Sequence, residues 1–295
     1  MLRLREYDSA ARFIEALRPL WEPRESELNL LVGVASGMAD GGAKIRGGAL
    51  EDAHGAPRAA ALLAESGLIV GATGADDAAE LAARLAVSDP YRRATRLAVS
   101  DPYRRATRLR ASLAEGTAFM DEWARHTGGA AMRIEPQHIW ALREAPTAPR
   151  SPGRLRPAES TDTELLASWF CAFDREALAE ASSSVDAKRI RVARGLAAGE
   201  LFVWEVDGEP MSTASVARPT PNGVAINRVY TPPGNRGRGY ASACVAAVSA
   251  IALAGGKQFT CLYTDSTKPA VGALYERLGY RVVTQAAIWR WAPAI

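Results

Sequence analysis

The sequence contains few residues of the kinds that form disulfides or bind metals. Its three cysteines are an odd number without CxxC spacing, which is typical of reduced, buried thiols. They are Cys171, Cys244 and Cys261. The three histidines, His54, His126 and His138, form no HxxxH or His–Cys ligand pattern. We therefore expect no metal site, and a covalent mechanism through a thiol is disfavoured.

Long apolar runs and a strong excess of one charge are also absent. No apolar run reaches the ~18–20 residues that span a bilayer. Residues 1–17 contain acids and lack the continuous apolar segment of a signal peptide. A formal net charge of +3 is too small to indicate nucleic-acid binding by itself. We expect a cytoplasmic protein with neither a membrane nor a nucleic acid as partner.

The length of 295 residues allows two domains of about 150 residues each. Residues 145–157, APTAPRSPGRLRP, carry four prolines and one glycine. Proline neither continues a helix nor donates to a central strand, so this segment is the best candidate for a linker. We predict domains at residues 1–147 and 148–295.

The most informative segment is 224–248, VAINRVYTPPGNRGRGYASACVAAV. It predicts a strand, a Pro-Pro corner, and a short Gly-Arg loop that opens directly into a helix. Such a loop presents backbone N–H groups at a helix N-terminus, beside the positive charges of Arg236 and Arg238. Gly237 and Gly239 allow a ligand to approach the backbone closely. The pattern indicates a site for a nucleotide-like diphosphate.

Three phosphate-binding motifs compete for this loop. The nucleoside-triphosphate motif GxxxxGK[ST] is missing. A dinucleotide fingerprint would need GxGxxG or GxGxxA, whereas Ser242 stands at its last position. An acidic residue, Asp265, does follow the next strand, so a dinucleotide-binding oxidoreductase is kept as an alternative function. The third pattern, Arg/Gln-x-x-Gly-x-Gly/Ala, is matched by Arg236, Gly239 and Ala241.

With this pattern the chain resembles the GNAT N-acetyltransferase superfamily, in which the segment holds the pyrophosphate of coenzyme A. A second match follows downstream, where the strand FTCLYTD (259–265) precedes PAVGALYERLGYRVV (269–283). The resemblance covers about residues 150–295 and implies an α/β fold with a mixed sheet in the order βααβββαβαββ. The Asp-Gly turn within LFVWEVDGEPMSTASVAR (201–218) predicts the hairpin that this order requires.

The resemblance also implies roles for individual residues. The pyrophosphate would be held by the segment Arg236, Gly237, Arg238, Gly239, Tyr240 and Ala241. Val229, Tyr230 and Thr231 would line the path of the pantetheine arm, and the N–H of Val229 at a bulge would polarise the thioester carbonyl. Lys268 stands where many relatives carry an Asn that binds pantetheine, so this contact stays open.

Tyr275 in the motif LYERLGY would protonate the departing thiolate, by the same resemblance. The alternative is a core tyrosine that packs on Leu274 and Leu278. The general base is unassigned, because Glu205 and Asp265 are equally credible as solvated carboxylates.

The expected reaction is acetyl transfer from acetyl-CoA to a primary amine by direct attack, without a metal. Trp169, Phe170 and Phe173 in SWFCAFDREAL are expected in the core, whereas Asp174 and Glu176 are candidates for holding a cationic acceptor. The acceptor is not identified, and a monomer or homodimer is expected. The alternative function is a catalytically silent module that binds acyl-CoA.

The N-terminal half repeats the element order more faintly and lacks the Arg-x-x-Gly-x-Gly/Ala motif. It is similar to a degenerate GNAT copy, and an unrelated α/β cap is the alternative. Within it, LAVSDPYRRATR occurs twice in succession, at 85–96 and 97–108. We expect a tolerated surface duplication; the alternative is a basic docking face for an acidic partner.

Overall fold

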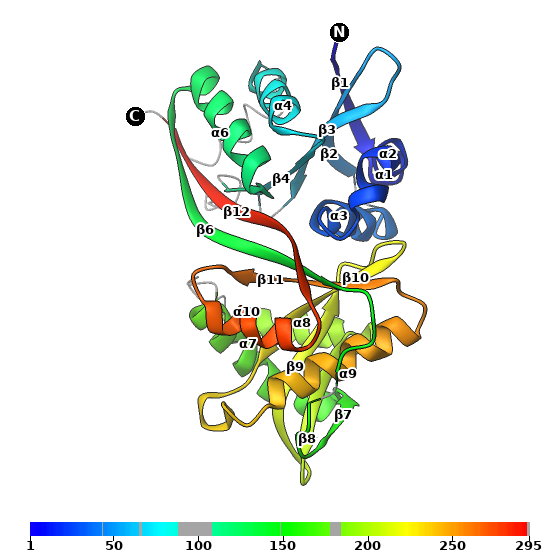
Figure 1. Cartoon of the computed structure of the whole chain (residues 1–295), viewed down its shortest axis with the longest axis vertical. Coiled ribbons are helices and arrows are strands. Elements are labelled where there is room, and N and C mark those ends of the chain that lie inside the picture. Colours follow the sequence, from blue (N-terminus) through cyan, green and yellow to red (C-terminus); the bar gives the residue numbers. More distant parts are fainter. Residues whose placement is uncertain (43, 65–66, 88–107, 148, 178–183, 294–295) are drawn as a thin grey trace. The chain divides into compact units, whose positions relative to one another are not determined.

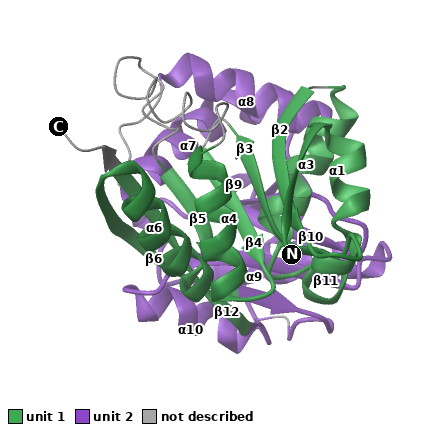
Figure 2. Cartoon of the chain, turned by 90° about the horizontal axis from the view of Figure 1, so that it is seen from above, with its two compact units in different colours: residues 1–139, 282–295 green, residues 140–281 purple. Residues whose placement is uncertain are grey.

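The computed structural model describes residues 1–42, 44–64, 67–87, 108–147, 149–177 and 184–293 (Figure 1). Residues 88–107 of the duplicated segment therefore lie outside the described residues. The chain divides into two compact units, one of Met1–Ile139 with Val282–Ile295 and one of Trp140–Arg281 (Figure 2). The domain boundary predicted between residues 147 and 148 stays a prediction.

The first unit consists of helices on a mixed sheet. Its elements are β1 (Arg3–Ser9), α1 (Ala10–Ala16), α2 (Arg18–Trp21), η1 (Glu22–Arg24), α3 (Asn29–Asp40), β2 (Lys44–Glu51), β3 (Pro57–Ala64), β4 (Gly67–Ala72), α4 (Ala75–Val87), β5 (Arg108–Ser112), α6 (Leu113–Thr127) and β6 (Gly129–Leu142), which continues into the second unit. The strand order β1-β2-β3-β4-β5 is completed by β12 (Arg281–Pro293) beside β5. The β4–β5 pair is parallel, and the other pairs in this order are antiparallel.

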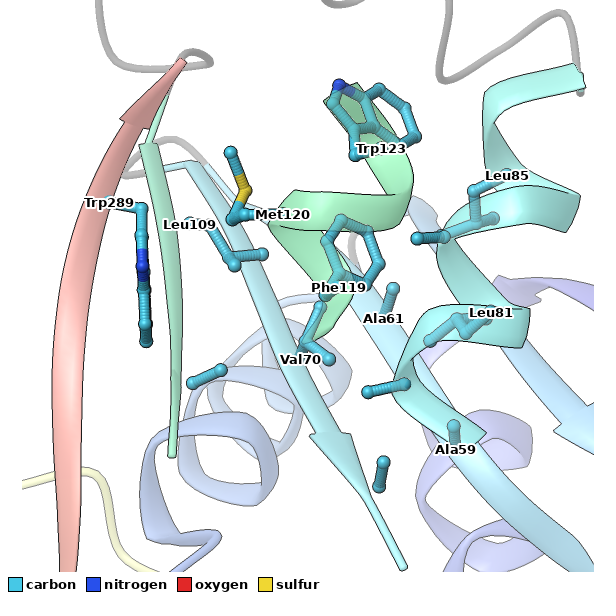
Figure 3. Close-up of a cluster of buried hydrophobic side chains, with 14 of the residues drawn as sticks. Ala59, Ala61, Val70, Leu81, Leu85, Leu109, Phe119, Met120, Trp123 and Trp289 are labelled. Atoms are coloured by element: carbon cyan, nitrogen blue, oxygen red, sulfur yellow. The ribbon is translucent and has the colours of Figure 1, made fainter. Parts of the chain in front are cut away.

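Both faces of this sheet are buried, because successive side chains of a strand point to opposite faces. Along β3, Ala59 and Ala61 belong to the cluster under α4 and α6, whereas Ala60 and Leu62 belong to the cluster under α1–α3. Figure 3 shows the first cluster, in which Phe119 and Trp123 of α6 approach Leu81 and Leu85 of α4. Small residues on β3 leave room for the large side chains of the helices.

Strands β1 and β2 were not predicted from the sequence. In β1, charged residues dominate a short outer strand that pairs only with β2 in the strand order. In β2, Gly47 weakens the strand signal, but a Cβ there would lie 2.9 Å from the ring of Phe13. The glycine is therefore needed for the packing of α1 on the sheet.

The second unit has a similar order of helices and strands, with α7 and α8 where the first unit has α1–α3. Its elements are β7 (Arg154–Pro157), η2 (Ser160–Asp162), α7 (Thr163–Ala177), α8 (Val185–Ala197), β8 (Leu201–Val206), β9 (Glu209–Ala217), β10 (Gly223–Tyr230), η3 (Pro233–Asn235), α9 (Tyr240–Ala254), β11 (Phe259–Asp265) and α10 (Pro269–Arg277). The strand order is β11-β10-β9-β8-β7, with only β10–β11 parallel. The predicted mixed α/β fold is confirmed; the two predicted final strands form the single strand β12.

Two clusters cover the two faces of the second sheet. On β8, Val203 belongs to the cluster with α7 and α8, and the next residue, Trp204, belongs to the cluster with α9 and α10. The predicted core residues Trp169, Phe170 and Phe173 lie in or against the first of these clusters. In the described part of the chain, no helix is long and apolar enough to cross a membrane.

The last strand of each half contributes to the other unit. Strand β12 comes from the C-terminal end of the chain, yet its residues Ala286–Arg290 pair with Ser112–Arg108 of β5. Strand β6 comes from the N-terminal half, and its end belongs to the second unit, where the indole N–H of Trp140 donates to Thr264 Oγ1 of β11 at 2.9 Å. The two halves thus exchange their final strands.

Candidate functional site

Strand β10 carries a bulge where the sequence predicted one. Asn227 pairs with Ser215 of β9 and Tyr230 with Thr213, so three steps on β10 oppose two on β9. Arg228 has a positive φ of 49°, which is uncommon for a residue with a side chain. The side-chain oxygen of Asn227 accepts the N–H of Arg228 at 2.7 Å and supports this conformation.

Beyond its first residues, β10 separates from its parallel neighbour. The pairing with β11 covers only Gly223–Phe259, Val224–Thr260 and Ala225–Cys261, although both strands continue further. Within the described residues, Val229 has no partner residue in the ladder of β10 with β9 or in that with β11. The backbone at Val229 is therefore placed where strands β10 and β11 no longer form a ladder.

The loop after β10 has the backbone geometry expected for a phosphate cradle. Gly237 and Gly239 have φ values of 77° and 84°, in the region that glycine adopts readily. Gly239 is the N-cap of α9, and no side chain caps this helix end. The first N–H groups of α9, from Tyr240 to Ser242, have no intrahelical partner by position. A Cβ on Gly237 would meet nothing within 4 Å, so the loop is open on that side.

The two arginines of this loop have different surroundings. The guanidinium of Arg236 donates to Thr231 O at 2.9 Å and to Glu176 Oε2 at 2.5 Å. Arg238 is exposed and forms no ion pair with the described residues. Arg238 is thus available to an anionic ligand, while Arg236 is already engaged with a carboxylate of α7.

Glu176 brings several predicted site residues together. The hydroxyl of Tyr230 donates to Glu176 Oε1 at 3.0 Å, and Lys268 Nζ donates to the backbone oxygen of Glu176 at 3.4 Å. The hydrogen bond from Arg236 lowers the pKa of Glu176 below its ordinary value. Thr231 Oγ1 forms a separate hydrogen bond with Ser212 Oγ at 2.8 Å.

A second group of predicted residues meets in the cluster beneath α9 and α10. Tyr240 and Tyr275 are buried in this cluster, and Val229 packs against it. The side chain of Tyr240 is therefore a core residue, and only its backbone faces the loop. Tyr275 is 8% exposed, and its ring meets that of Tyr280 edge-on at 5.9 Å. Burial raises the pKa of Tyr275 to about 12.

A family model described as an acetyltransferase (GNAT) domain matches residues 197–282. This range contains the bulged strand, the glycine loop and Tyr275. Residues 197–282 are therefore similar to GNAT acetyltransferase domains. Acetyl-CoA is the cosubstrate of such domains.

Solved structures show that the GNAT-type fold extends over the whole chain. A GCN5-related N-acetyltransferase from Sphaerobacter thermophilus has a TM-score of 0.64 at 16% identity, covering 100% of this chain and 97% of its own. A GNAT-family acetyltransferase from Colwellia psychrerythraea has a TM-score of 0.57 at 11% identity, with coverages of 99% and 100%. A tandem GNAT protein from the clavulanic acid biosynthesis pathway has a TM-score of 0.56 at 12% identity, covering 100% of both chains. No curated protein is significantly similar in sequence.

The two candidates for the general base, Glu205 and Asp265, are both paired with neighbouring cations. Glu205 accepts from Arg156 at 2.5 Å and from Arg154 at 3.0 Å, and these hydrogen bonds lower its pKa. Asp265 is partly desolvated, which raises its pKa, but hydrogen bonds from Thr267 and Lys268 outweigh this effect and lower it. Lowered pKa values make both carboxylates weaker bases.

The carboxylates proposed to hold a cationic acceptor are also already paired. Asp174 contacts Lys188 of α8 and accepts from Arg228 at 3.3 Å, and Glu176 is bound by Arg236. Sequence reasoning missed Arg228 and Lys188. A signal for Arg228 was present, because an arginine interrupts the apolar residues of strand VAINRVY.

The corresponding turn of the first unit differs from the glycine loop between β10 and α9. After β4, helix α4 begins with Asp76 and Asp77 in its first turn, which repel a diphosphate. The N–H of Ala72 is taken by Glu115 Oε2 at 3.2 Å, and Glu115 is paired with Arg24 at 2.9 Å. Within the described residues, no group of three or more His, Cys, Asp or Glu could hold a metal ion.

Proposed function

We propose that the chain transfers an acetyl group from acetyl-CoA to the primary amine of a small molecule or peptide, by direct attack in a ternary complex. One observation carries the proposal: a bulged strand that leaves its parallel neighbour leads into a loop of left-handed glycines at the uncapped N-terminus of α9. Oriented N–H groups and a helix dipole favour a diphosphate at this position.

The residues around the loop fit coenzyme A in the proposed roles. Backbone N–H groups from Gly237 to Ala241 and the free guanidinium of Arg238 hold the pyrophosphate. Arg236 joins them only by giving up its contact with Glu176. Tyr230, Thr231 and Lys268 border the pantetheine arm, with the backbone at Val229 nearest the thioester.

The proposed reaction assigns a role to each protein group. The N–H of Val229 donates to the thioester oxygen and stabilises the negative charge that develops there. The amine nitrogen forms a bond to the acyl carbon, and the carbon–sulfur bond breaks. The hydroxyl of Tyr275 donates to the departing sulfur, and the proton lost by the amine returns through water to solvent. This route requires no covalent enzyme intermediate.

Calorimetric titration with acetyl-CoA tests the donor site, using Gly239→Glu and the matched control Gly208→Glu. Both glycines have a φ of 84°, so the two substitutions introduce similar backbone strain and the same charge. Gly208 lies in the β8–β9 turn, away from the loop in sequence. We expect the wild type and Gly208→Glu to bind, and Gly239→Glu to lose at least about tenfold in affinity, equivalent to ~1.4 kcal/mol.

NADH and free coenzyme A complete this test. Binding of NADH in preference to acetyl-CoA would contradict the proposal and favour a dinucleotide-binding oxidoreductase. Equal loss of affinity in both glutamate variants would show that strain, not the pyrophosphate contact, causes the effect.

A second candidate function is a catalytically silent module that senses acyl-CoA. It is favoured by the ion pairs and lowered pKa values of Glu205 and Asp265. Both carboxylates are ion-paired with lowered pKa values, so neither is a ready base. Tight binding of acetyl-CoA without acetylation of any amine in a broad panel would support this candidate.

A further inference from the structure

The α7–α8 side of the second unit contains a buried group of three charged side chains. Lys188 of α8 and Arg228 of β10 both contact Asp174 of α7. The side chains of Lys188, Asp174 and Arg228 are 4%, 7% and 14% exposed. Arg228 therefore keeps a narrow access to solvent, while its two partners are almost fully enclosed. We call these three residues the buried triad.

The buried triad has one positive charge in excess, because two cations share one carboxylate. Burial lowers the pKa of Arg228, and the positive charges of Arg191 and Arg218 add to this effect against the opposing attraction of Asp174. Among the described residues whose charges shift this pKa, Asp174 is the only anion. A desolvated charge without a counterion is costly, so the position is suited to receive an anion.

Arg228 is held in a fixed orientation at the proposed reaction centre. Its guanidinium lies over the rings of Phe170 at 4.9 Å and Phe173 at 5.9 Å. Its backbone adopts a positive φ on the bulge and is directly bonded to Val229. Strained residues persist where the surroundings over-determine them, and they cluster at functional sites.

We propose that Arg228 binds a carboxylate of the acceptor, so that the substrates are amines that carry a carboxylate, such as amino acids. This inference rests on the proposed acetyl transfer. A guanidinium offers paired N–H donors that match a carboxylate, and the acceptor would supply the charge that the buried triad lacks. The next residue, Val229, faces the opposite cluster, so one short segment of β10 would orient both substrates.

A matched panel of substrates tests the inference. Each common amino acid is compared with its own C-terminal amide, at a saturating concentration of acetyl-CoA, and kcat/KM is followed by thiol release. The proteins are the wild type, Arg228→Met, Arg228→Lys and Arg189→Met. Arg189 is a suitable control, because it lies on α8 beside Lys188 but is exposed and bonded to Glu164 and Asp186.

We expect the wild type to prefer at least one acid over its amide by about tenfold or more, through a lower KM. Arg228→Met should reduce this preference to within about twofold, Arg228→Lys should keep part of it, and Arg189→Met should keep all of it. Lys188 and Asp174 remain as a neutral pair in Arg228→Met, so the variant is expected to fold. Its melting temperature and its affinity for acetyl-CoA verify this.

Three results would overturn the inference: equal use of acids and amides by the wild type, an unchanged preference in Arg228→Met, or neither turnover nor binding with any acid. Binding is measured by titrating N-acetyl amino acids and their amides into the protein alone. A wild type that does not bind acetyl-CoA refutes the proposed function instead, and the N-acetyl amino acid titration still decides whether Arg228 binds carboxylates.

Discussion

Replacing Tyr275 with Phe separates the catalytic interpretation of this residue from the structural one. The pKa of Tyr275 is about 12, whereas an ordinary thiol has a pKa near ~8.5. Complete proton transfer to the thiolate would therefore be uphill by roughly 5 kcal/mol. Tyr275 is expected to act by donating a hydrogen bond as negative charge develops on the sulfur.

A hydrogen bond to a charged group contributes about 1.5–3 kcal/mol, which corresponds to a factor of about 10–150 in kcat. We therefore expect Tyr275→Phe to lower kcat by this factor and to leave the affinity for acetyl-CoA within about twofold. Its hydroxyl forms no hydrogen bond with the described residues. The melting temperature should consequently stay the same or rise slightly.

Tyr280→Phe is the matched control, because the two rings pack against each other in the same cluster. The hydroxyl of Tyr280 forms hydrogen bonds of 2.8 Å with both Ser249 and Thr260. Its loss should cost about 1–3 kcal/mol of stability, and each kcal/mol lowers the melting temperature of a 150–250-residue domain by about 2–4 °C. The loss of kcat in Tyr280→Phe should be much smaller than that in Tyr275→Phe.

Steady-state kinetics by thiol release and thermal unfolding of both variants give the two readouts. A Tyr275→Phe variant with wild-type kcat would refute the proposed catalytic role. A large loss of stability in the same variant would show that the hydroxyl supports the core instead.

Two further predictions concern stability. Gly223→Ala should lower the free energy of unfolding by about 1–3 kcal/mol, because its Cβ would lie 2.1 Å from the buried ring of Phe259; Gly234→Ala, with nothing within 4 Å, is the control, and equal urea midpoints would contradict the reasoning. The hydrogen bonds from Arg156 lower the pKa of Asp162 below its ordinary 3.8, so this stabilisation is present above that pH and is lost as the pH falls through the lowered pKa. The urea midpoint of the wild type should therefore fall below about pH 4, and more steeply than that of Asp162→Asn.

The strands and helices that the sequence predicted best are those with local signals. Pro-Pro and Gly-Arg residues marked the end of β10 and the start of α9, and the Asp-Gly turn marked the β8–β9 hairpin. Strand β2 was not predicted, because Gly47 weakens the strand pattern. The reason for the glycine is its contact with the ring of Phe13, which is far away in the sequence. The exchange of β6 and β12 also depends on pairing between distant segments, which no local pattern encodes.

The same distinction applies to the candidate site. The backbone of the loop could be predicted, since glycines at fixed spacing dictate positive φ values. The partners of its side chains could not. The contact between Arg236 and Glu176 joins residues 60 positions apart, and the buried triad joins α7, α8 and β10. The excess positive charge of the buried triad depends on the packing of these three elements, so the sequence alone does not reveal it.

The exchanged strands impose an order on synthesis. Strand β5 pairs with β4 on one side and with β12 on the other, and β12 leaves the ribosome only after the whole of Trp140–Arg281 has been made. At ~5–20 residues per second, the nascent first unit waits about 7–28 s with an open strand edge at β5. The second unit can form most of its sheet during that time. During synthesis, the open edge of β5 in the N-terminal half is therefore the site at which pairing with strands of other chains is most to be expected.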